Sequence, residues 1–186
     1  GALSRGKTVT EDTKQILPTG ELEGPPESTV PYFLADHTCS LIDQCSAEAS
    51  PYFVWHNFGG PHGPYYSPRE YVDLYRDICI HHSPTLIGPR VQYPVRIMSR
   101  FTPSAKRWLE GLGERDCYYY AFTTLIDKQI GRIYAHRERT GQLNKTIIIC
   151  TADHGETAGG HGGLTDKGWQ HFEEIQRMPM IIRCPD

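Results

Sequence analysis

Two glycine-flanked loops of the sequence carry side chains that could bind a metal ion or an oxyanion. Asp153 and His154 precede Gly155 in one loop, and His62 lies among prolines and glycines in the other. A carboxylate oxygen and an imidazole nitrogen are a reasonable partial shell for a divalent cation. Adjacent side chains of a regular strand point to opposite faces, so these two could share one ion only where Gly155 lets the backbone leave the strand. The alternative is an aspartate that caps the following turn beside an incidental histidine.

The segment after Gly155 is dense in glycine and contains two further candidates, His161 and Lys167. Glycine allows the backbone to approach a ligand closely. The Lys167 ammonium could stabilise charge that develops on the oxygens of a metal-held anion, and His62 could act as an acid or as an anion contact. Each also has an ordinary interpretation: a solvated lysine, a loop histidine without a role, and a histidine that makes a structural hydrogen bond.

Both loops follow apolar, β-rich segments. Residues 52–58 predict a largely buried strand after Pro51, and residues 146–150 predict another strand that opens onto Asp153. In open α/β sheets, functional loops lie just beyond the carboxyl ends of strands. The sequence therefore places both loops where a site is expected.

The order of the predicted elements indicates the fold class. Apolar residues at three- and four-residue steps predict a long helix over 114–139, which Gly141 ends. Residues 1–30 are expected to be largely loop. The remaining expected elements are helices at 36–47 (with Asp36 as N-cap), 68–75 and 172–176, and a strand at 180–183. This alternation predicts an α/β fold with a mostly parallel sheet flanked by helices.

Length and composition restrict the class of protein. The chain has 186 residues, of which 38% are hydrophobic, and its formal net charge is −3. It is long enough for one domain with a sizeable core, and its charge balance argues against a nucleic-acid partner bound over the whole surface. No apolar run approaches the roughly 18–20 residues of a membrane span. The sequence carries no signal for an oligomeric state.

The six cysteines are scattered, without the spacing of a metal-binding finger or a redox motif. Cys150 and Cys184 end apolar runs, where cysteine is typically a small buried hydrophobe. This pattern favours a reducing compartment, so we expect a cytoplasmic location rather than a periplasmic or secreted one.

Three blocks of the sequence, in matching order and spacing, resemble the sulfatase family of the alkaline phosphatase superfamily. Residues 51–65 are similar to its apolar strand and Pro-His-x-Pro loop, and residues 124–133 to the helix that leads to the metal strand. Residues 146–155 are similar to its metal loop, and the lysine at 167 and the Arg-x-Pro-x-Ile segment at 177–185 match the next parts of the family pattern. The resemblance covers the chain from about residue 32 onward. It implies an alkaline-phosphatase-like fold.

The resemblance also implies a role for each candidate residue. Asp153 and His154 would ligate a divalent cation. Because the implied shell is rich in oxygen ligands, Ca2+ is favoured, with Mn2+ or Mg2+ as alternatives. His62 and Lys167 would grip the sulfate and assist the leaving-group oxygen, and His161 is a candidate substrate contact. The implied reaction is hydrolysis of a sulfate ester of a small molecule or a saccharide. Its implied nucleophile is a formylglycine made from Cys or Ser, and the metal polarises the ester oxygens.

Parts of the family pattern have no counterpart in this sequence. The family nucleophile lies in Cys-x-Pro-x-Arg, and no cysteine or serine of the chain begins that pattern. The paired aspartates that complete the metal shell also precede the blocks found here. Residues 1–186 are therefore expected to be part of a longer sulfatase-type catalytic domain, inactive alone, with the formylglycine in its N-terminal part. Gly160 stands where many relatives have Asp, just before His161.

Other functions stay open at this point. A phosphonate monoester or phosphodiester hydrolase of the same superfamily uses a nearly identical site, and a non-catalytic binding module could have kept the fold. A transition-metal hydrolase built on His62, His154 and His161 would lack the helical spacing of the common zinc motif. Comparing the hydrolysis of an aryl sulfate with that of an aryl phosphonate separates the phosphonate hydrolase from a sulfatase, because turnover of the phosphonate alone would exclude a sulfatase. An upstream aspartate pair with the nucleophile motif separates an enzyme from a binding module.

Overall fold

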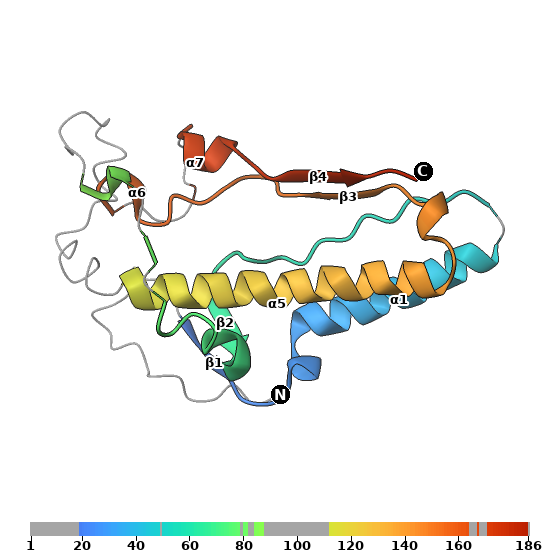
Figure 1. Ribbon diagram of the computed structural model, residues 1–186, viewed down its shortest axis with the longest axis horizontal. Helices are drawn as coiled ribbons and strands as arrows, with labels where there is room; N and C mark the ends of the chain where they lie inside the picture. Colours follow the sequence, from blue (N-terminus) through green and yellow to red (C-terminus); the bar gives the residue numbers. More distant parts are fainter. Residues whose placement is uncertain are drawn as a thin grey trace. The chain divides into compact units, whose positions relative to one another are not determined.

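The computed structural model describes residues 19–48, 50–78, 80–81, 84–87, 112–163, 167 and 171–185 (Figure 1). These residues fall into two compact units. Unit 1 lies within Gly1–Ile78 and Cys117–Leu143, and unit 2 within Cys79–Asp116 and Asn144–Asp186. Helices and strands occur in both units, so the α/β class expected from the sequence is confirmed.

Unit 1 contains two long helices and a small parallel sheet. α1 spans Val30–Ala47 and α5 spans Leu112–Arg139, of which the part from Cys117 onward belongs to this unit. β1 (Thr19–Leu22) pairs in parallel with β2 (Tyr65–Pro68), and the short α2 (Arg69–Val72) follows β2 directly. A 3-10 turn, η2 (Pro26–Ser28), precedes α1. Strand β1 lies within residues 1–30, which were expected to be largely loop; residues 1–18 lie outside the described residues, so that expectation stays a prediction.

α1 begins at Val30 rather than at Asp36. Thr29 is its N-cap: the hydroxyl accepts a hydrogen bond from the Tyr32 N–H at 3.4 Å and donates one to the Pro26 carbonyl at 2.6 Å. A threonine cap followed by a proline in the first helical turn is a strong start signal, and it precedes the predicted start. Asp36 pairs instead with Arg132 of α5, at 3.0 Å.

Charged and apolar contacts together hold α1 alongside α5 (Figure 1). The Arg132 guanidinium lies 3.5 Å from the centre of the Tyr32 ring, and His136 Nε2 lies 2.7 Å from Asp43 Oδ1. The buried core of this unit has members on both helices: Ala35, Ile42, Ala121, Leu125 and Ile126. Apolar periodicity predicted α5 closely, and Gly141 follows it with a φ of 65°.

Unit 2 contains an antiparallel pair of strands and several short turns. β3 (Ile148–Thr151) pairs with β4 (Met180–Arg183), with Thr151 opposite Met180. Both strands lie where the sequence predicted them, as does α7 (Glu173–Gln176). The remaining short elements are η3 (Pro84–Ile87), η5 (Leu143–Lys145), which begins at the end of unit 1, and α6 (Gly160–Gly163). Of the two sheets described, one is parallel and one antiparallel.

The predicted strand at 52–58 is not a strand in the structure. Its residues pair with no strand in the described part of the chain, and Phe53 and Trp55 are 82% and 80% exposed. Val54, His56 and Phe58 are half-buried, so the alternation of an extended segment is kept. A strand needs a hydrogen-bonded neighbour, which local propensity cannot supply. The burial expected for Cys184 is also wrong, because it is exposed, and Cys150 is half-buried; both are free thiols.

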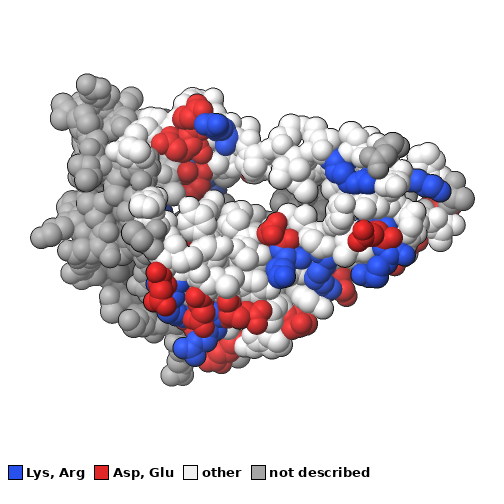
Figure 2. Space-filling view, viewed as in Figure 1, with Lys and Arg blue, Asp and Glu red and all other residues white. Residues whose placement is uncertain are grey.

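The described surface carries charges of both signs. On the face shown in Figure 2, Lys and Arg of the described residues lie among Asp and Glu and form no extended basic patch. None of the helices in this described part combines the length and apolar content that crossing a membrane requires.

Replacing Thr29 by alanine removes the N-cap of α1, so we expect Thr29→Ala to lower the free energy of unfolding by about 1 kcal/mol. Thr29→Ser keeps the hydroxyl and is the control. Urea denaturation of both variants measures the difference. Equal stability of Thr29→Ala and the wild type would show that α1 does not depend on this cap.

His56 anchors the extended segment to α1 through a hydrogen bond with Thr38, and burial lowers its pKa from 6.5. The unfolded chain therefore binds the proton more readily than the folded protein. The contribution of neutral His56 to stability is complete above the unfolded pKa and is lost as pH falls through the lowered one. Between about pH 7.5 and about pH 5, we expect the wild type to lose more stability than His56→Gln in urea denaturation. Parallel pH profiles would exclude this role.

Candidate functional site

Asp153 and His154 follow β3 after one intervening residue, Ala152, and lie beside each other beyond the end of the β3–β4 ladder. Asp153 Oδ1 accepts a hydrogen bond from the His154 backbone N–H at 3.0 Å. The other carboxylate oxygen, Oδ2, lies 3.6 Å from His154 Nε2. The Asp153 side chain is 88% exposed and that of His154 is 36% exposed. The two potential ligand atoms are thus close together and open to solvent.

The tautomer of His154 suits metal binding. Its Nδ1 lies 2.9 Å from the Gly155 carbonyl oxygen, which can only accept, so Nδ1 carries the hydrogen. The lone pair is then on Nε2, the nitrogen that faces Asp153. A backbone carbonyl that fixes the ring in this way is the usual arrangement for a histidine that ligates a metal. Among the described residues, no group of three or more His, Cys, Asp or Glu side chains converges on one point. The pair therefore offers two ligands, and the rest of a coordination shell would have to come from elsewhere.

Gly155 holds this loop against α7. Its N–H donates to the Ile175 carbonyl at 2.7 Å. A Cβ at this position would collide with the Glu174 carbonyl oxygen and come within 3.0 Å of the Glu174 carbonyl carbon. The sequence analysis expected Gly155 to let the backbone leave the strand. The structure shows a different reason for glycine here, which is the close approach of two backbones.

His161 is held on three sides. Its Nε2–H donates to Glu174 Oε2 at 2.9 Å, its ring stacks on Phe172 with centroids 3.8 Å apart, and its backbone N–H donates to Thr85 Oγ1 at 3.0 Å. A carboxylate oxygen can only accept, so Nε2 carries the hydrogen. The side chain is 17% exposed. Its role as a substrate contact remains a prediction.

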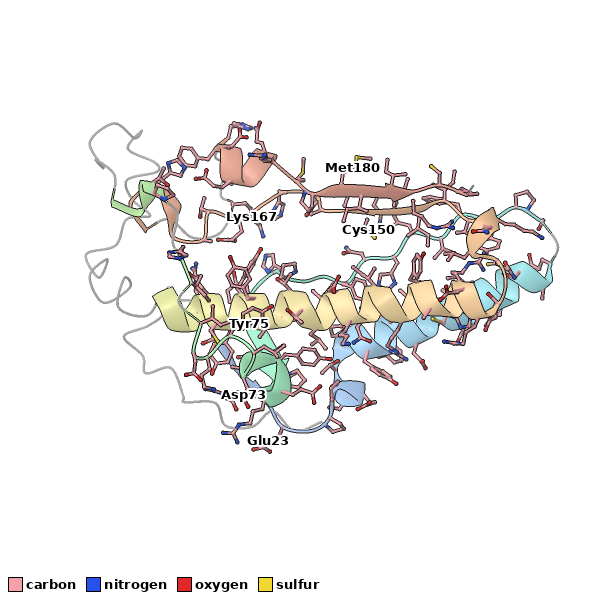
Figure 3. All side chains as sticks on the ribbon, viewed as in Figure 1. Glu23, Asp73, Tyr75, Cys150, Lys167 and Met180 are labelled. Atoms are coloured by element: carbon pink, nitrogen blue, oxygen red, sulfur yellow. The ribbon has the colours of Figure 1, made fainter. Side chains whose placement is uncertain are left out.

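Lys167 also belongs to unit 2 and is half-buried. Figure 3 shows it toward the carboxyl end of β3, the end from which the Asp153–His154 loop departs. Its role as an anion contact remains a prediction.

His62 belongs to unit 1 and is exposed. Its Nδ1–H donates to the Gly63 carbonyl at 2.6 Å, so contact with an anion would have to come from Nε2. The start of its loop packs on α5, because a Cβ on Gly60 would lie 2.7 Å from atoms of both Phe122 and Ile126. A glycine thus fixes this loop, as Gly155 fixes the other.

The structure brings Asp153 and His154 together and places His161 and Lys167 in the same unit, whereas His62 is part of the other unit. Sequence reasoning missed Glu174, which contacts both the Asp153–His154 loop and His161. The helix expected at 172–176 placed Glu174 on a short turn. The sequence carried no signal that it pairs with a histidine 13 residues away.

The family model described as Sulfatase matches residues 22–186. The chain is 27% identical over 163 residues to the uncharacterized sulfatase YidJ of Escherichia coli, covering 82% of this chain and 30% of that protein. It is 45% identical over 67 residues to the N-acetylglucosamine-6-O-sulfatase of Bacteroides thetaiotaomicron, covering 36% of this chain and 12% of that protein.

Among solved structures, the phosphonate monoester hydrolase of Agrobacterium radiobacter superposes with a TM-score of 0.75. The sequence identity is 23%, and the match covers 92% of this chain and 37% of that one. This likeness shows the fold alone and confirms the alkaline-phosphatase-like architecture expected from the sequence. The chain spans about a third or less of the length of the first curated relatives that it matches.

Because no Cβ fits at Gly155, we expect Gly155→Ala to separate the Asp153–His154 loop from α7 and to lower stability by about 1–3 kcal/mol. Gly131→Ala in α5 is the matched control, since a Cβ there meets nothing within 4 Å. In a helix interior the control should raise stability by about 0.5–1 kcal/mol. Urea denaturation measures both. If Gly155→Ala is as stable as the wild type, the loop does not depend on this contact.

Proposed function

The chain belongs to the sulfatase family, and on this premise we propose that the whole protein is a metal-dependent sulfuric-ester hydrolase. The observation that carries the proposal is the pairing of Asp153 Oδ2 and His154 Nε2, 3.6 Å apart, immediately beyond β3. A carboxylate oxygen and a neutral imidazole nitrogen at this distance can ligate one cation. Further ligands would have to come from other residues of the protein.

In this proposal Asp153 and His154 hold the divalent cation, with Ca2+ preferred and Mn2+ or Mg2+ as alternatives. The Gly155 carbonyl keeps the His154 lone pair on Nε2, and α7 holds the loop in place through Gly155. When bound, the cation would act as a Lewis acid that polarises the oxygens of the ester.

Lys167 and His62 are proposed as the residues that bind the sulfate group. An ammonium and an imidazole N–H both donate to sulfate oxygens and stabilise the charge that develops on the leaving-group oxygen. With Nδ1–H of His62 bound to the Gly63 carbonyl, Nε2 is the atom left to face the anion, and it donates to a sulfate oxygen when the ring is an imidazolium that carries hydrogen on both nitrogens. Formylglycine is the nucleophile that family membership implies.

We propose a sulfated saccharide or a small sulfate ester as substrate. Support comes from the relative named N-acetylglucosamine-6-O-sulfatase, which is 45% identical over the 67 residues matched. The cytoplasmic location expected from the cysteines stays a prediction.

We expect the whole protein to hydrolyse p-nitrophenyl sulfate and to lose that activity after treatment with a chelator. Asp153→Asn should lower kcat/KM by about 100-fold or more, because it weakens cation binding. Lys167→Met should lower kcat/KM to a similar extent, because it removes the positive charge that contacts the sulfate group. Asp127→Asn, on the exposed face of α5, is the control and should behave as the wild type.

Calorimetric titration of the chelator-treated protein with Ca2+ gives a readout independent of turnover. Asp153→Asn and His154→Ala should bind Ca2+ more weakly, whereas Lys167→Met should bind it as the wild type does. Hydrolysis of an aryl phosphonate with no hydrolysis of the sulfate would overturn the choice of substrate. Ca2+ binding without hydrolysis of either ester would indicate a binding module.

A further inference from the structure

Glu174 of α7 contacts two segments that carry candidate site residues, one through its carboxylate and one through its backbone carbonyl. Its Oε2 accepts from His161 Nε2 at 2.9 Å, and its side chain is 30% exposed. Its backbone carbonyl lies where a Cβ of Gly155 would be, next to the Asp153–His154 loop. One residue therefore contacts both the segment that carries the proposed metal ligands and the segment that leads to Lys167.

The segment held by Glu174 has a strained backbone. Ala158 and His161 both have positive φ values, 43° and 53°, a region that residues other than glycine avoid. Each such residue costs on the order of 1 kcal/mol or more, so contacts elsewhere must stabilise this conformation. The contacts that His161 makes with Glu174, Phe172 and Thr85 are suited to that task.

These contacts leave little of the His161 ring for a substrate. One face stacks on Phe172 at an angle of 13°, and Nε2 is bound to Glu174. The ring is thus used to fix its own loop, which continues to Lys167 within a few residues.

We propose that Glu174 is a positioning residue that acts through His161 to hold the glycine-rich segment 158–163, and with it Lys167, in the conformation that binds the sulfate group. This inference rests on the proposed function of the site. In this proposal His161 acts as the partner of Glu174, in place of the substrate contact expected from the sequence.

The proposal predicts how the kinetics change. In this proposal, loss of the charge-assisted hydrogen bond lets the strained segment leave the observed conformation in most molecules. Substrate then binds only the fraction that keeps this conformation, so KM rises while kcat is kept once the enzyme is saturated. A merely structural defect has a different signature: it lowers the amount of active enzyme and with it the apparent kcat, and KM does not change.

The test uses the whole protein and p-nitrophenyl sulfate. Glu174→Ala and His161→Asn should each raise KM about tenfold, with kcat within about twofold of the wild type. Asparagine tolerates the left-handed backbone at this position but cannot reach Glu174. Glu174→Gln keeps an acceptor for the imidazole N–H and should restore KM to within about threefold of the wild type. The double variant should raise KM no further than the larger of the two single changes.

A second histidine–carboxylate pair provides the control. His136 Nε2 of α5 lies 2.7 Å from Asp43 Oδ1 of α1, and this pair joins the two helices of unit 1. Asp43→Ala should leave KM unchanged, even where stability falls.

The outcomes separate this inference from the proposed function. A wild type that hydrolyses no sulfate ester contradicts the proposed function. An active wild type with KM unchanged in Glu174→Ala contradicts the positioning role, as does a double variant in which the two effects multiply. A larger KM change in His161→Asn than in Glu174→Ala, with no rescue by Glu174→Gln, would indicate that His161 touches the substrate.

Discussion

The close contact between Gly155 and α7 is the constraint on which the proposed metal site depends. Asp153 and His154 lie beyond the last paired residues of β3, where the ladder no longer fixes the backbone. Their positions are set instead by the Gly155 N–H bound to Ile175 and by the Glu174 carbonyl that occupies the place of a Cβ. The contact between the Glu174 carbonyl and the Gly155 backbone also orients the His154 ring indirectly, because the Gly155 carbonyl accepts the hydrogen bond from His154 Nδ1–H.

Glycine has the same function in both candidate loops. Gly60 lets the His62 loop lie against Phe122 and Ile126 of α5, and Gly155 lets the other loop lie against α7. In each case a histidine close by donates Nδ1–H to the carbonyl of the glycine next in sequence, which leaves Nε2 as its contact atom. Rigid placement of the loop and a fixed tautomer of the histidine therefore come from the same few residues.

The sequence predicted the parts of this structure that depend on local pattern. α5 follows from apolar periodicity, and β3 and β4 follow from short apolar runs. The segment at 52–58 has the composition of a strand, but pairing is a tertiary property that composition does not determine. Residue types and adjacency predicted Asp153 and His154 as metal ligands, and that role stays a prediction. The contact of Glu174 with His161 joins segments 13 residues apart in sequence. Contacts of that kind could be found only from the structure.

Anomalous diffraction from crystals of the whole protein soaked with Mn2+ tests the central claim most directly. Mn2+ is one of the cations that suit a carboxylate and an imidazole. The account predicts one anomalous peak within bonding distance of both Asp153 Oδ2 and His154 Nε2, with Nδ1 of His154 still bound to the Gly155 carbonyl. A peak that contacts only one of the two side chains, or no peak beside a fully ordered loop, would contradict it.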